Sequence, residues 1–421
     1  MEGLPEGYHR AVSREVQMKK VLYISYFAPY DTVDHAGGKV HNFYVKKMQK
    51  EKELDVTLLT MCYKREVSRL DLERYGIDYR LVVLDQNCRQ KLWRKFYSGF
   101  SYFNPWDSYS GVLLNYERHC LKKMIREYAA KNVAPDLIVL QWTQIVLLLP
   151  YIRTLYPKVP VVAIEEDVLF LNFYRQIGLA ENFLRKQIAQ YRYRNMRAKE
   201  LQALADAQLV VTNNPKDGKL LLENQIDPAK LFVSSVYFEN YGKIDRKPAG
   251  KELLFYGAMY RDENHKSVMW LLDEVLPKLP KEYHLTVVGG RPRKELLDRA
   301  DERVTVTGFV EDVVPYFERC LCLTAPLVLG AGIKVKVLEA MSAAIPVLTN
   351  DIGIEGIEAQ DGRDYFHCDQ AGEYVDRIIA LGEDTELVRQ IGQNGKRYVA
   401  EHFDLEAKYQ ELLARMEQLP S

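Results

Sequence analysis

Short apolar runs alternate with longer amphipathic segments along the chain, a pattern typical of repeated strand–helix units. In the first half, six runs have the length and bulk of buried strands, at residues 20–25, 55–60, 79–84, 136–140, 159–164 and 207–212. The pattern restarts in the second half, with apolar runs at residues 252–256, 284–288, 304–306 and 346–348. A polar segment at 237–250, which contains Gly242, Pro248 and Gly250, separates the two series and is the best linker candidate. We therefore predict an α/β protein with two Rossmann-like domains.

The glycine turn and helix within residues 326–351 carry the strongest chemical signal. Gly330 and Gly332 allow a sharp turn and a close approach of the backbone to a ligand. The apolar spacing after them predicts a helix, whose N-terminus offers unpaired N–H groups and a positive dipole end. Lys334 and Lys336 lie in its first turn, where cations oppose the dipole, and no acidic residue offsets them. A bound anion such as a diphosphate would make this arrangement favourable. The alternative is two solvated lysines on an ordinary surface helix.

Composition narrows the class of protein. With 421 residues the chain is long enough for two domains, and 58 basic residues balance 58 acidic ones, which argues against a nucleic-acid binder. The first 19 residues lack the apolar core of a signal peptide, and no apolar run approaches the ~20 residues of a membrane span. We expect a cytoplasmic protein. Its six scattered cysteines are expected to be buried free thiols.

Two features of the first half lie where parallel strands end, the edge at which open α/β sheets bind ligands. Glu165, Glu166 and Asp167 follow the run at 159–164. Glu166 and Asp167 are candidates for contact with a substrate, although Asp167 would also suit the cap of the next helix. Gly37 and Gly38 follow the first strand and its loop, without the Gly-x-Gly-x-x-Gly fingerprint of dehydrogenases. A simple helix-start turn is the other interpretation of this glycine pair.

The segment 91–109 interleaves basic residues with Trp, Tyr and Phe, and includes Trp93 and Trp106. Such side chains suit a membrane interface, where they are half wet and half buried, and they also suit a sugar or lipid-linked acceptor. An insertion packed on its own domain explains the composition equally well, so these alternatives stay open.

The run Gly330-x-Gly332-Ile-Lys334-x-Lys336-Val-Leu-Glu339-Ala-Met341 resembles the donor-site motif of glycosyltransferase family 4, and is closest to a branch that includes bacterial exopolysaccharide sugar transferases. The resemblance implies retaining enzymes of the GT-B fold, with two Rossmann-like domains whose parallel sheets face a central cleft. It assigns 1–240 to the acceptor-side domain, 241–403 to the nucleotide-sugar domain, and 404–421 to a helix that packs back on the first. Many family members also carry a glutamate eight residues before Glu339. That position is Ala331 here, which leaves sugar recognition to other groups.

The resemblance also implies roles for individual residues. Glu339 would bind the ribose hydroxyls, Gly308, Phe309 and Val310 would meet the nucleobase, and Arg261 with Lys266 would clamp the diphosphate. A related pattern, Gly-small-Met-x-x-x-x-Asn over 257–264, would instead leave both basic residues in solvent. The loop 351–356 is expected to close the phosphate side. The predicted donor-binding set is Gly37, Gly38, Gly257, Arg261, Lys266, Gly308, Phe309, Val310, Gly330, Ala331, Gly332, Ile333, Lys334, Lys336 and Glu339, and the predicted catalytic set is Asp167, Glu166 and Lys334.

These expectations define a hypothesis: transfer of a sugar from a nucleoside diphosphate sugar to an acceptor hydroxyl with retained configuration, in bacterial surface polysaccharide or glycoconjugate synthesis. The acceptor would be a glycan, a lipid-linked molecule or another hydroxyl compound. No metal and no other cofactor is expected, no nucleic acid is a partner, and contact with the inner face of the membrane would run through 91–109. The alternatives are a non-catalytic subunit with the same fold that binds or chaperones a glycosyltransferase, and a nucleotide-sugar epimerase.

Overall fold

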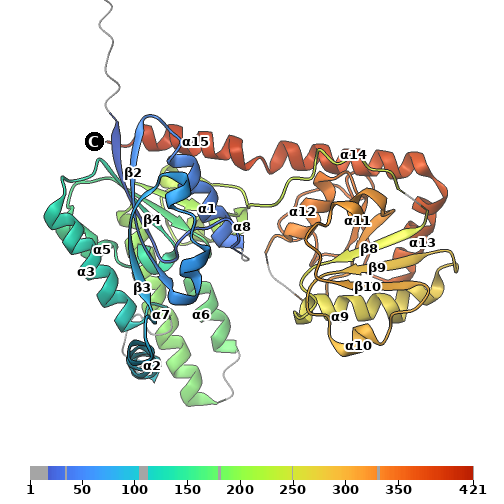
Figure 1. Cartoon of the computed structure of the whole chain (residues 1–421), viewed down its shortest axis with the longest axis horizontal. Coiled ribbons are helices and arrows are strands. Elements are labelled where there is room, and N and C mark those ends of the chain that lie inside the picture. Colours follow the sequence, from blue (N-terminus) through green and yellow to red (C-terminus); the bar gives the residue numbers. More distant parts are fainter. Residues whose placement is uncertain are drawn as a thin grey trace, which may run out of the picture. The chain divides into compact units, whose positions relative to one another are not determined.

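The computed structural model describes residues 18–33, 36–103, 112–178, 182–248, 250–329 and 332–420. The chain divides into two compact units. Unit 1 comprises Met1–Thr212, Leu221–Phe232 and Arg415–Ser421, and unit 2 comprises Asn213–Leu220 and Val233–Ala414. Figure 1 colours most of unit 1 from blue to green and its C-terminal residues red, and it colours unit 2 mainly from yellow to red. The predicted domain boundary at 240/241 lies eight residues after the boundary between the compact units, at 232/233.

Within the described residues, unit 1 is built on a seven-stranded sheet of order β3-β2-β1-β4-β5-β6-β7. Its strands are β1 (Lys19–Ser25), β2 (Leu54–Tyr63), β3 (Asp78–Leu84), β4 (Leu137–Gln141), β5 (Val161–Glu165), β6 (Leu209–Thr212) and β7 (Leu231–Val233). Neighbouring strands from β3 to β6 run parallel. Strands β4 and β5 are buried at every position, as expected where helices cover both faces of a parallel sheet.

Helices surround this sheet (Figure 1). They are α1 (Ala36–Met48), α2 (Cys88–Phe103), α3 (Asn115–Lys131), α4 (Thr143–Val146), α5 (Leu149–Leu155), α6 (Leu169–Gly178) and α7 (Phe183–Asp206), followed by α8 (Pro215–Glu223), whose residues divide between the units.

The sheet of unit 2 has six strands among the described residues, all parallel, in the order β10-β9-β8-β11-β12-β13. The strands are β8 (Glu252–Tyr256), β9 (His284–Val288), β10 (Val304–Gly308), β11 (Cys322–Ala325), β12 (Val347–Thr349) and β13 (Phe366–His367). The helices are α9 (Asp262–Trp270), α10 (Lys294–Leu297), α11 (Val314–Arg319), α12 (Val335–Ser342), α13 (Ala371–Glu383), α14 (Thr385–His402) and α15 (Leu405–Glu417), the last of which ends in unit 1.

Both sheets reverse their strand order at one place, between β1 and β4 in unit 1 and between β8 and β11 in unit 2. At such a switch point the loops after the two central strands diverge, one to each side of the sheet. They leave a crevice at the carboxyl ends of the strands, where α/β proteins bind ligands. Each unit therefore has one position at which its topology favours a site.

The two Rossmann-like units and most predicted strands are confirmed, and the differences have local causes. Strands β7 and β13 are too short to give an apolar pattern. The polar segment at 237–250 is partly fixed to unit 2, because Arg246 donates to the carbonyl oxygens of Phe317, Cys320 and Ala344. Helix α9 ends at Trp270, and the chain continues as a π turn and a 3₁₀ turn to Lys278.

A buried carboxylate in α7 was missed. Glu200, which sequence reasoning did not single out, is fully buried and accepts hydrogen bonds from the backbone N–H groups of Leu169 and Phe170. It thus caps the N-terminus of α6 from 30 residues away.

All six cysteines are free thiols. Cys62, Cys320, Cys322 and Cys368 are buried as predicted, whereas Cys88 is exposed, so the prediction is wrong there. Cys120 is partly buried. In the described parts of the chain, no helix has both the length and the apolar character needed to cross a membrane.

Helix α14 packs against the end of α12 through a glycine, and this contact yields a prediction. A Cβ at Gly392 would lie 2.2 Å from the carbonyl oxygen of Ala344. We expect Gly392→Ala to lower the free energy of unfolding by about 1–3 kcal/mol, since overpacking forces the backbone to move. Urea denaturation measures the change. Gly372→Ala is the matched control, because nothing lies within 4 Å of its Cβ position and alanine favours a helix by about 0.5–1 kcal/mol. Equal effects of both substitutions would contradict this packing.

Candidate functional site

Helix α12 begins at the switch point of unit 2, after the loop that follows β11. Lys334 is its N-cap residue, and no acidic residue occupies the first turn. Gly332 has φ = 72°, a left-handed conformation that glycine adopts without strain. The helix N-terminus and its two lysines therefore have the predicted arrangement. Gly330 and Ala331, which belong to the same prediction, lie outside the described residues.

Lys336 extends from α12 towards the loop after β8. Its Nζ atom donates to Oδ1 of Asn264 at 2.5 Å and lies 4.6 Å from the ring centroid of Phe255. Desolvation, opposed by Glu263 and Glu339, lowers the pKa of Lys336 to about 7. Among the described residues, no carboxylate comes within ion-pair distance of this ammonium.

Gly257 makes room for this cation. It directly follows β8 with φ = 149°, and a Cβ there would lie 2.9 Å from both Nζ of Lys336 and Nδ2 of Asn264. Asn264 is buried, and its Nδ2 donates to the carbonyl oxygen of Ala258 at 3.0 Å. Gly257, Asn264 and Lys336 thus form one cluster of contacting residues at the switch point of unit 2. From the sequence, Asn264 was only the last residue of the Gly-small-Met-x-x-x-x-Asn pattern. The structure shows that its side chain accepts a hydrogen bond from Lys336.

Glu339 lies one turn further along α12 and is held by two groups. Its Oε2 atom accepts from the hydroxyl of Tyr256 at 2.5 Å, and its Oε1 accepts from the backbone N–H of Glu239 at 3.3 Å. Burial, reinforced by Glu339, raises the pKa of Tyr256 well above its usual range, so the phenol stays a donor. The carboxylate is fixed in orientation next to the lysine pair.

The loop after β12 packs on the glycine turn. Glu355 accepts from the backbone N–H of Gly332 at 2.8 Å and lies 3.6 Å from Nζ of Lys334. The Lys334 ammonium also donates to the carbonyl oxygen of Gly332. Partial burial lowers the pKa of Lys334, against the effect of Glu355. A Cβ at Gly356 would lie 2.8 Å from Ile333, so this loop covers the turn closely. Sequence reasoning expected the loop 351–356 on the phosphate side but assigned no role to Glu355 within it.

Arg261 and Lys266 form ion pairs with neighbours in their own segment. Arg261 lies 3.1 Å from Glu263, and Lys266 lies 3.8 Å from Asp262. Their side chains are 59% and 55% exposed, respectively. This arrangement follows the alternative pattern in which Asn264 is the inward residue, and the diphosphate clamp stays a prediction.

The loop after β10 adjoins the loop after β9. The backbone N–H of Gly289 donates to the carbonyl oxygen of Gly308 at 2.9 Å, and Gly308 has φ = 72°. The Phe309 side chain is 78% exposed, whereas Val310 packs partly on the core of unit 2. An exposed aromatic ring beside two glycine loops provides a flat surface for a planar ligand.

In unit 1, a tryptophan that sequence reasoning missed stands at the switch point. Trp142 follows β4 with φ = 79°, a strained conformation for a bulky residue that is often found at functional sites. Its ring lies 5.4 Å from that of Phe27 and 6.4 Å from that of His41. A Cβ at Gly37 would lie 2.7 Å from Trp142 and 2.9 Å from Glu166. The glycine therefore allows α1, the tryptophan and the carboxylate to meet.

The predicted acids after β5 have different environments. Glu166 accepts from the side-chain amide of Gln141, whose Oε1 accepts from Tyr23 at 2.6 Å, so a buried network orients this carboxylate. Glu165 is buried and accepts from Thr143. Asp167 is exposed, and its carbonyl oxygen also accepts from Thr143, at 3.0 Å. Glu200 accepts from the first two backbone N–H groups of α6, those of Leu169 and Phe170.

A cavity of about 440 Å³ opens beside this cluster within unit 1. Its lining combines aromatic and charged side chains with the second glycine of the pair, and consists of Phe27, Ala28, Tyr30, Val33, Gly38, His41, Tyr63, Arg65, Glu66 and Arg69. The Arg69 guanidinium lies 4.9 Å from the Tyr30 ring and donates to the carbonyl oxygen of Thr32. The cavity is large enough for a small organic ligand.

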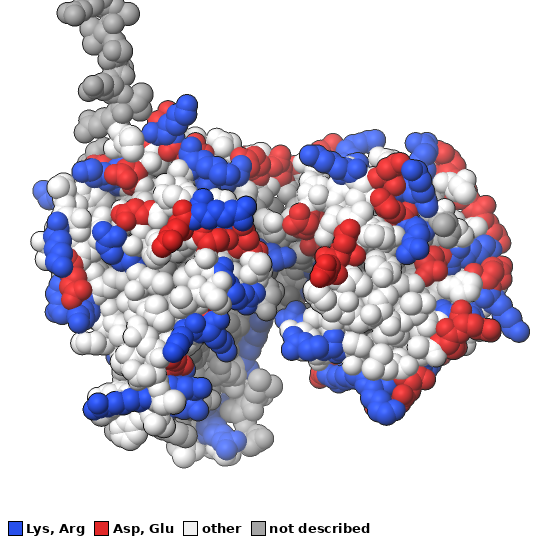
Figure 2. All heavy atoms as spheres, viewed as in Figure 1, with Lys and Arg blue, Asp and Glu red and all other residues white. Residues whose placement is uncertain are grey.

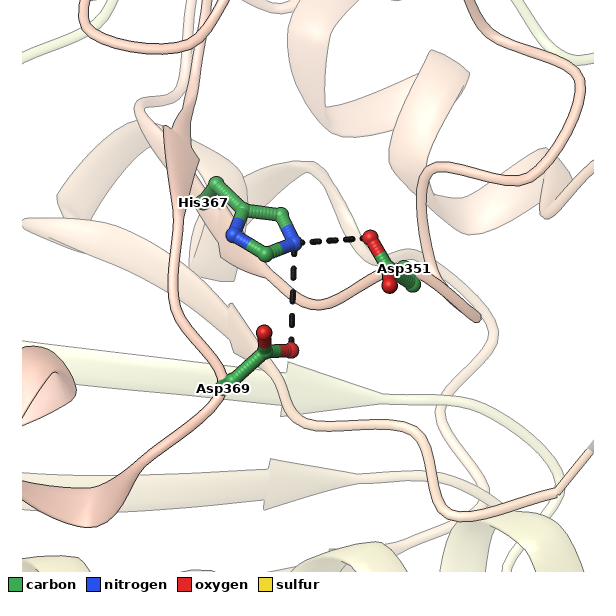
Figure 3. A group of neighbouring side chains, drawn as sticks. All are labelled: Asp351, His367 and Asp369. Carbon is green, nitrogen blue, oxygen red and sulfur yellow. Dashed lines mark hydrogen bonds and ion pairs between the residues drawn. The ribbon is translucent and has the colours of Figure 1, made fainter.

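One group of side chains in the described residues has donor atoms close enough for a metal ion (Figure 3). Nε2 of His367 lies 3.0 Å from Asp351 and 3.8 Å from Asp369, and the two aspartate side chains are 88% and 51% exposed. Ion pairing of the histidine with the carboxylates accounts for this arrangement, so we assign it no ligand.

Comparisons with solved structures identify the fold. Solved structures similar to the whole chain include Anabaena HepE in complex with UDP, with a TM-score of 0.65, 14% identity, and coverage of 95% of this chain and 100% of that one. Sucrose-phosphate synthase from Thermosynechococcus elongatus has a TM-score of 0.62, also at 14% identity, with 95% and 98% covered. The chain has the GT-B fold of glycosyltransferases, as predicted.

The sequence comparisons locate the family relationship. Residues 250–384, which lie within unit 2, match the family model of glycosyl transferases group 1. An uncharacterized 44.6 kDa protein in the cps region of Klebsiella pneumoniae is 24% identical over 36% of this chain and 42% of its own. Trehalose synthase of Pyrococcus horikoshii is 22% identical over 44% and 43%, respectively. The chain thus spans about two fifths of the length of these curated relatives.

The low pKa of Lys336 predicts how stability depends on pH. An unfolded lysine has a pKa near 10.4, so between about pH 7 and 10 the unfolded state binds more protons than the folded state. Stability contributed by this group therefore rises with pH across that window, by up to about 1.4 kcal/mol per pH unit. Urea denaturation at several pH values should show a smaller rise for Lys336→Met. Lys266→Met, at an exposed position of the same unit, should leave the rise unchanged. Parallel curves for Lys336→Met and the unmodified chain would exclude this titration.

Proposed function

We propose that the protein is a retaining glycosyltransferase that moves a sugar from a nucleoside diphosphate sugar to an acceptor hydroxyl. The observation that carries the proposal is the N-terminus of α12, where Lys334 and the partly buried Lys336 gather positive charge at a switch point. A diphosphate would supply an anion for Lys336, which has no carboxylate at ion-pair distance among the described residues. It also restores the charged form of Lys336, because a nearby negative charge raises the pKa of an ammonium.

The comparisons support a nucleotide-sugar donor. Structures of the similar HepE protein contain UDP in one case and UDP-glucose in another. In the present chain, Glu339 is oriented by Tyr256 and would accept from the ribose hydroxyls. The exposed ring of Phe309 would lie against the nucleobase. Gly257 and Gly332 let the backbone approach the diphosphate.

The chemical requirement is stabilisation of the departing diphosphate. The bond between the anomeric carbon and the diphosphate oxygen breaks, and its electron pair leaves with the diphosphate. The acceptor oxygen bonds to the same face of the sugar, and its proton passes to the leaving diphosphate, so the configuration is retained. Helix N–H groups, Lys334 and Lys336 act on the leaving group, and the proposed route has no metal step.

The acceptor would bind in unit 1. The cavity beside Trp142 offers aromatic rings for a sugar face and hydrogen-bonding groups for hydroxyls. Glu166, held by Gln141, and the exposed Asp167 are the candidates for contact with the acceptor hydroxyl or the transferred sugar. A glycan or lipid-linked acceptor in bacterial surface polysaccharide or glycoconjugate synthesis fits this site, and the Klebsiella relative in a cps region agrees with it.

Two substitutions test the donor site. Lys334→Ala and Glu339→Ala should each lower the release of nucleoside diphosphate from the donor by about a hundredfold, since each removes a group that acts on charge or orientation at the reacting bond. Lys294→Ala is the control, because this side chain is 85% exposed in the same unit. Circular dichroism confirms folding. Near-normal turnover in both site variants would refute the assignment.

The donor itself is identified by a thermal-shift screen of UDP-, GDP- and ADP-sugars. A ligand at 100 times its dissociation constant adds about 2.7 kcal/mol of stability, which raises the melting temperature measurably. Donor stabilisation without turnover, even with acceptor extracts, would favour the non-catalytic alternative.

A further inference from the structure

Helix α2 in unit 1 turns a continuous aromatic and apolar face to solvent. Leu92, Trp93, Phe96 and Tyr97 are 67%, 48%, 68% and 44% exposed. Their spacing of i, i+1, i+4 and i+5 places them on one side of the helix. The Trp93 ring stacks on Tyr97 at 5.6 Å and contacts Phe96 edge-on at 6.3 Å. The rings pack on one another, and all of them remain substantially exposed.

All charged residues of helix α2 are basic. Its 16 residues include Arg89, Lys91, Arg94 and Lys95 and no acidic residue. Arg94 is turned inward, with a bidentate ion pair to Asp85 at 2.9 Å, and its side chain is only 18% exposed. This pair anchors α2 to unit 1. Arg89, Lys91 and Lys95 are exposed around the apolar face.

The start of helix α7 also combines exposed apolar side chains with exposed basic ones. At the start of α7, Phe183 and Leu184 are 79% and 69% exposed, and the exposed Arg185 and Lys186 follow them. The Asn182 side chain caps this helix, so these residues have a defined conformation. Figure 1 shows α2 and the start of α7 at the same end of unit 1. In Figure 2, basic side chains outnumber acidic ones at this end.

We propose that α2 and the start of α7 dock unit 1 on the surface of an anionic lipid bilayer. Helices that bind in the plane of an interface combine an exposed Trp, Phe and Leu face with Lys and Arg beside it, and the basic residues are attracted to anionic lipid headgroups. A second copy of the chain fits less well, because it would bring basic residues against basic residues. The docking goes beyond the proposed function and does not depend on it.

Vesicle sedimentation tests the docking with the full chain. Vesicles of phosphatidylcholine with one third phosphatidylglycerol should bind the protein, vesicles of phosphatidylcholine alone should bind it weakly, and added salt should release it. The pair Lys91→Glu with Lys95→Glu, and the pair Trp93→Ser with Phe96→Ser, should each lower the partition coefficient by about tenfold or more. Val133→Ser is the matched control, because Val133 is 73% exposed in the same unit but lies outside both elements.

Tryptophan fluorescence gives a second readout. Emission should shift to the blue on binding to anionic vesicles, and Trp93→Phe should remove most of the shift while it preserves sedimentation. Absence of vesicle binding, equal binding by the charge-reversed variant, or a change of oligomeric state in place of vesicle binding would each overturn the proposal. Release of nucleoside diphosphate without vesicles should be unchanged in these variants, so this test and that of the donor site can fail separately.

Discussion

The position of one ammonium group constrains the arrangement of unit 2. Lys336 is partly buried in the first turn of α12, with Asn264 as its hydrogen-bond acceptor. Desolvation of a cation is costly, and an amide oxygen offsets only part of that cost. Gly257 must lack a side chain for the ammonium to fit, and Asn264 must be buried to receive it. A folded protein retains such an arrangement at the expense of stability, which is characteristic of a binding site.

The strand order explains why Gly257 and the partly buried Lys336 lie next to each other. The switch point between β8 and β11 brings together the loop after β8, which carries Gly257, and the helix after β11, which carries Lys336. The equivalent position in unit 1, between β1 and β4, brings Gly37 of α1 against Trp142. In each unit a glycine allows close contact and another residue carries strain or uncompensated charge. A switch point with a glycine contact therefore occurs once in each unit. The one in unit 2 suits an anion, and the one in unit 1 suits a ligand that stacks on aromatic rings.

Sequence reasoning recovered those parts of the fold and site whose signal is local. Buried strands show as apolar runs, and the turn, lysines and glutamate of α12 lie within ten residues of one another. Tyr256, Glu355 and Trp142 were missed because their roles arise from contacts across 83, 23 and 105 residues, to Glu339, Gly332 and Gly37 respectively. No periodicity signals such a contact. Arg261 and Lys266 show a different limit of local signals. Their five-residue spacing resembles a diphosphate clamp, but the spacing does not reveal that both side chains form ion pairs with neighbouring carboxylates.

The two sites also differ in what they can discriminate under the proposed function. In unit 2 the polar side chains engage one another, Lys336 with Asn264 and Glu339 with Tyr256. What the site offers a ligand is mainly positive charge, helix N–H groups and one oriented carboxylate, which suit the part that all nucleoside diphosphate sugars share. In unit 1 the cavity is lined by rings and charged groups of particular shape, including Tyr30, Tyr63 and Arg69. Under the proposed function, selection of the acceptor would therefore depend on side chains in unit 1, whereas binding of the diphosphate would depend on backbone and charge in unit 2. Sequence divergence should accordingly be tolerated more in the lining of the first site than around Gly257 and α12.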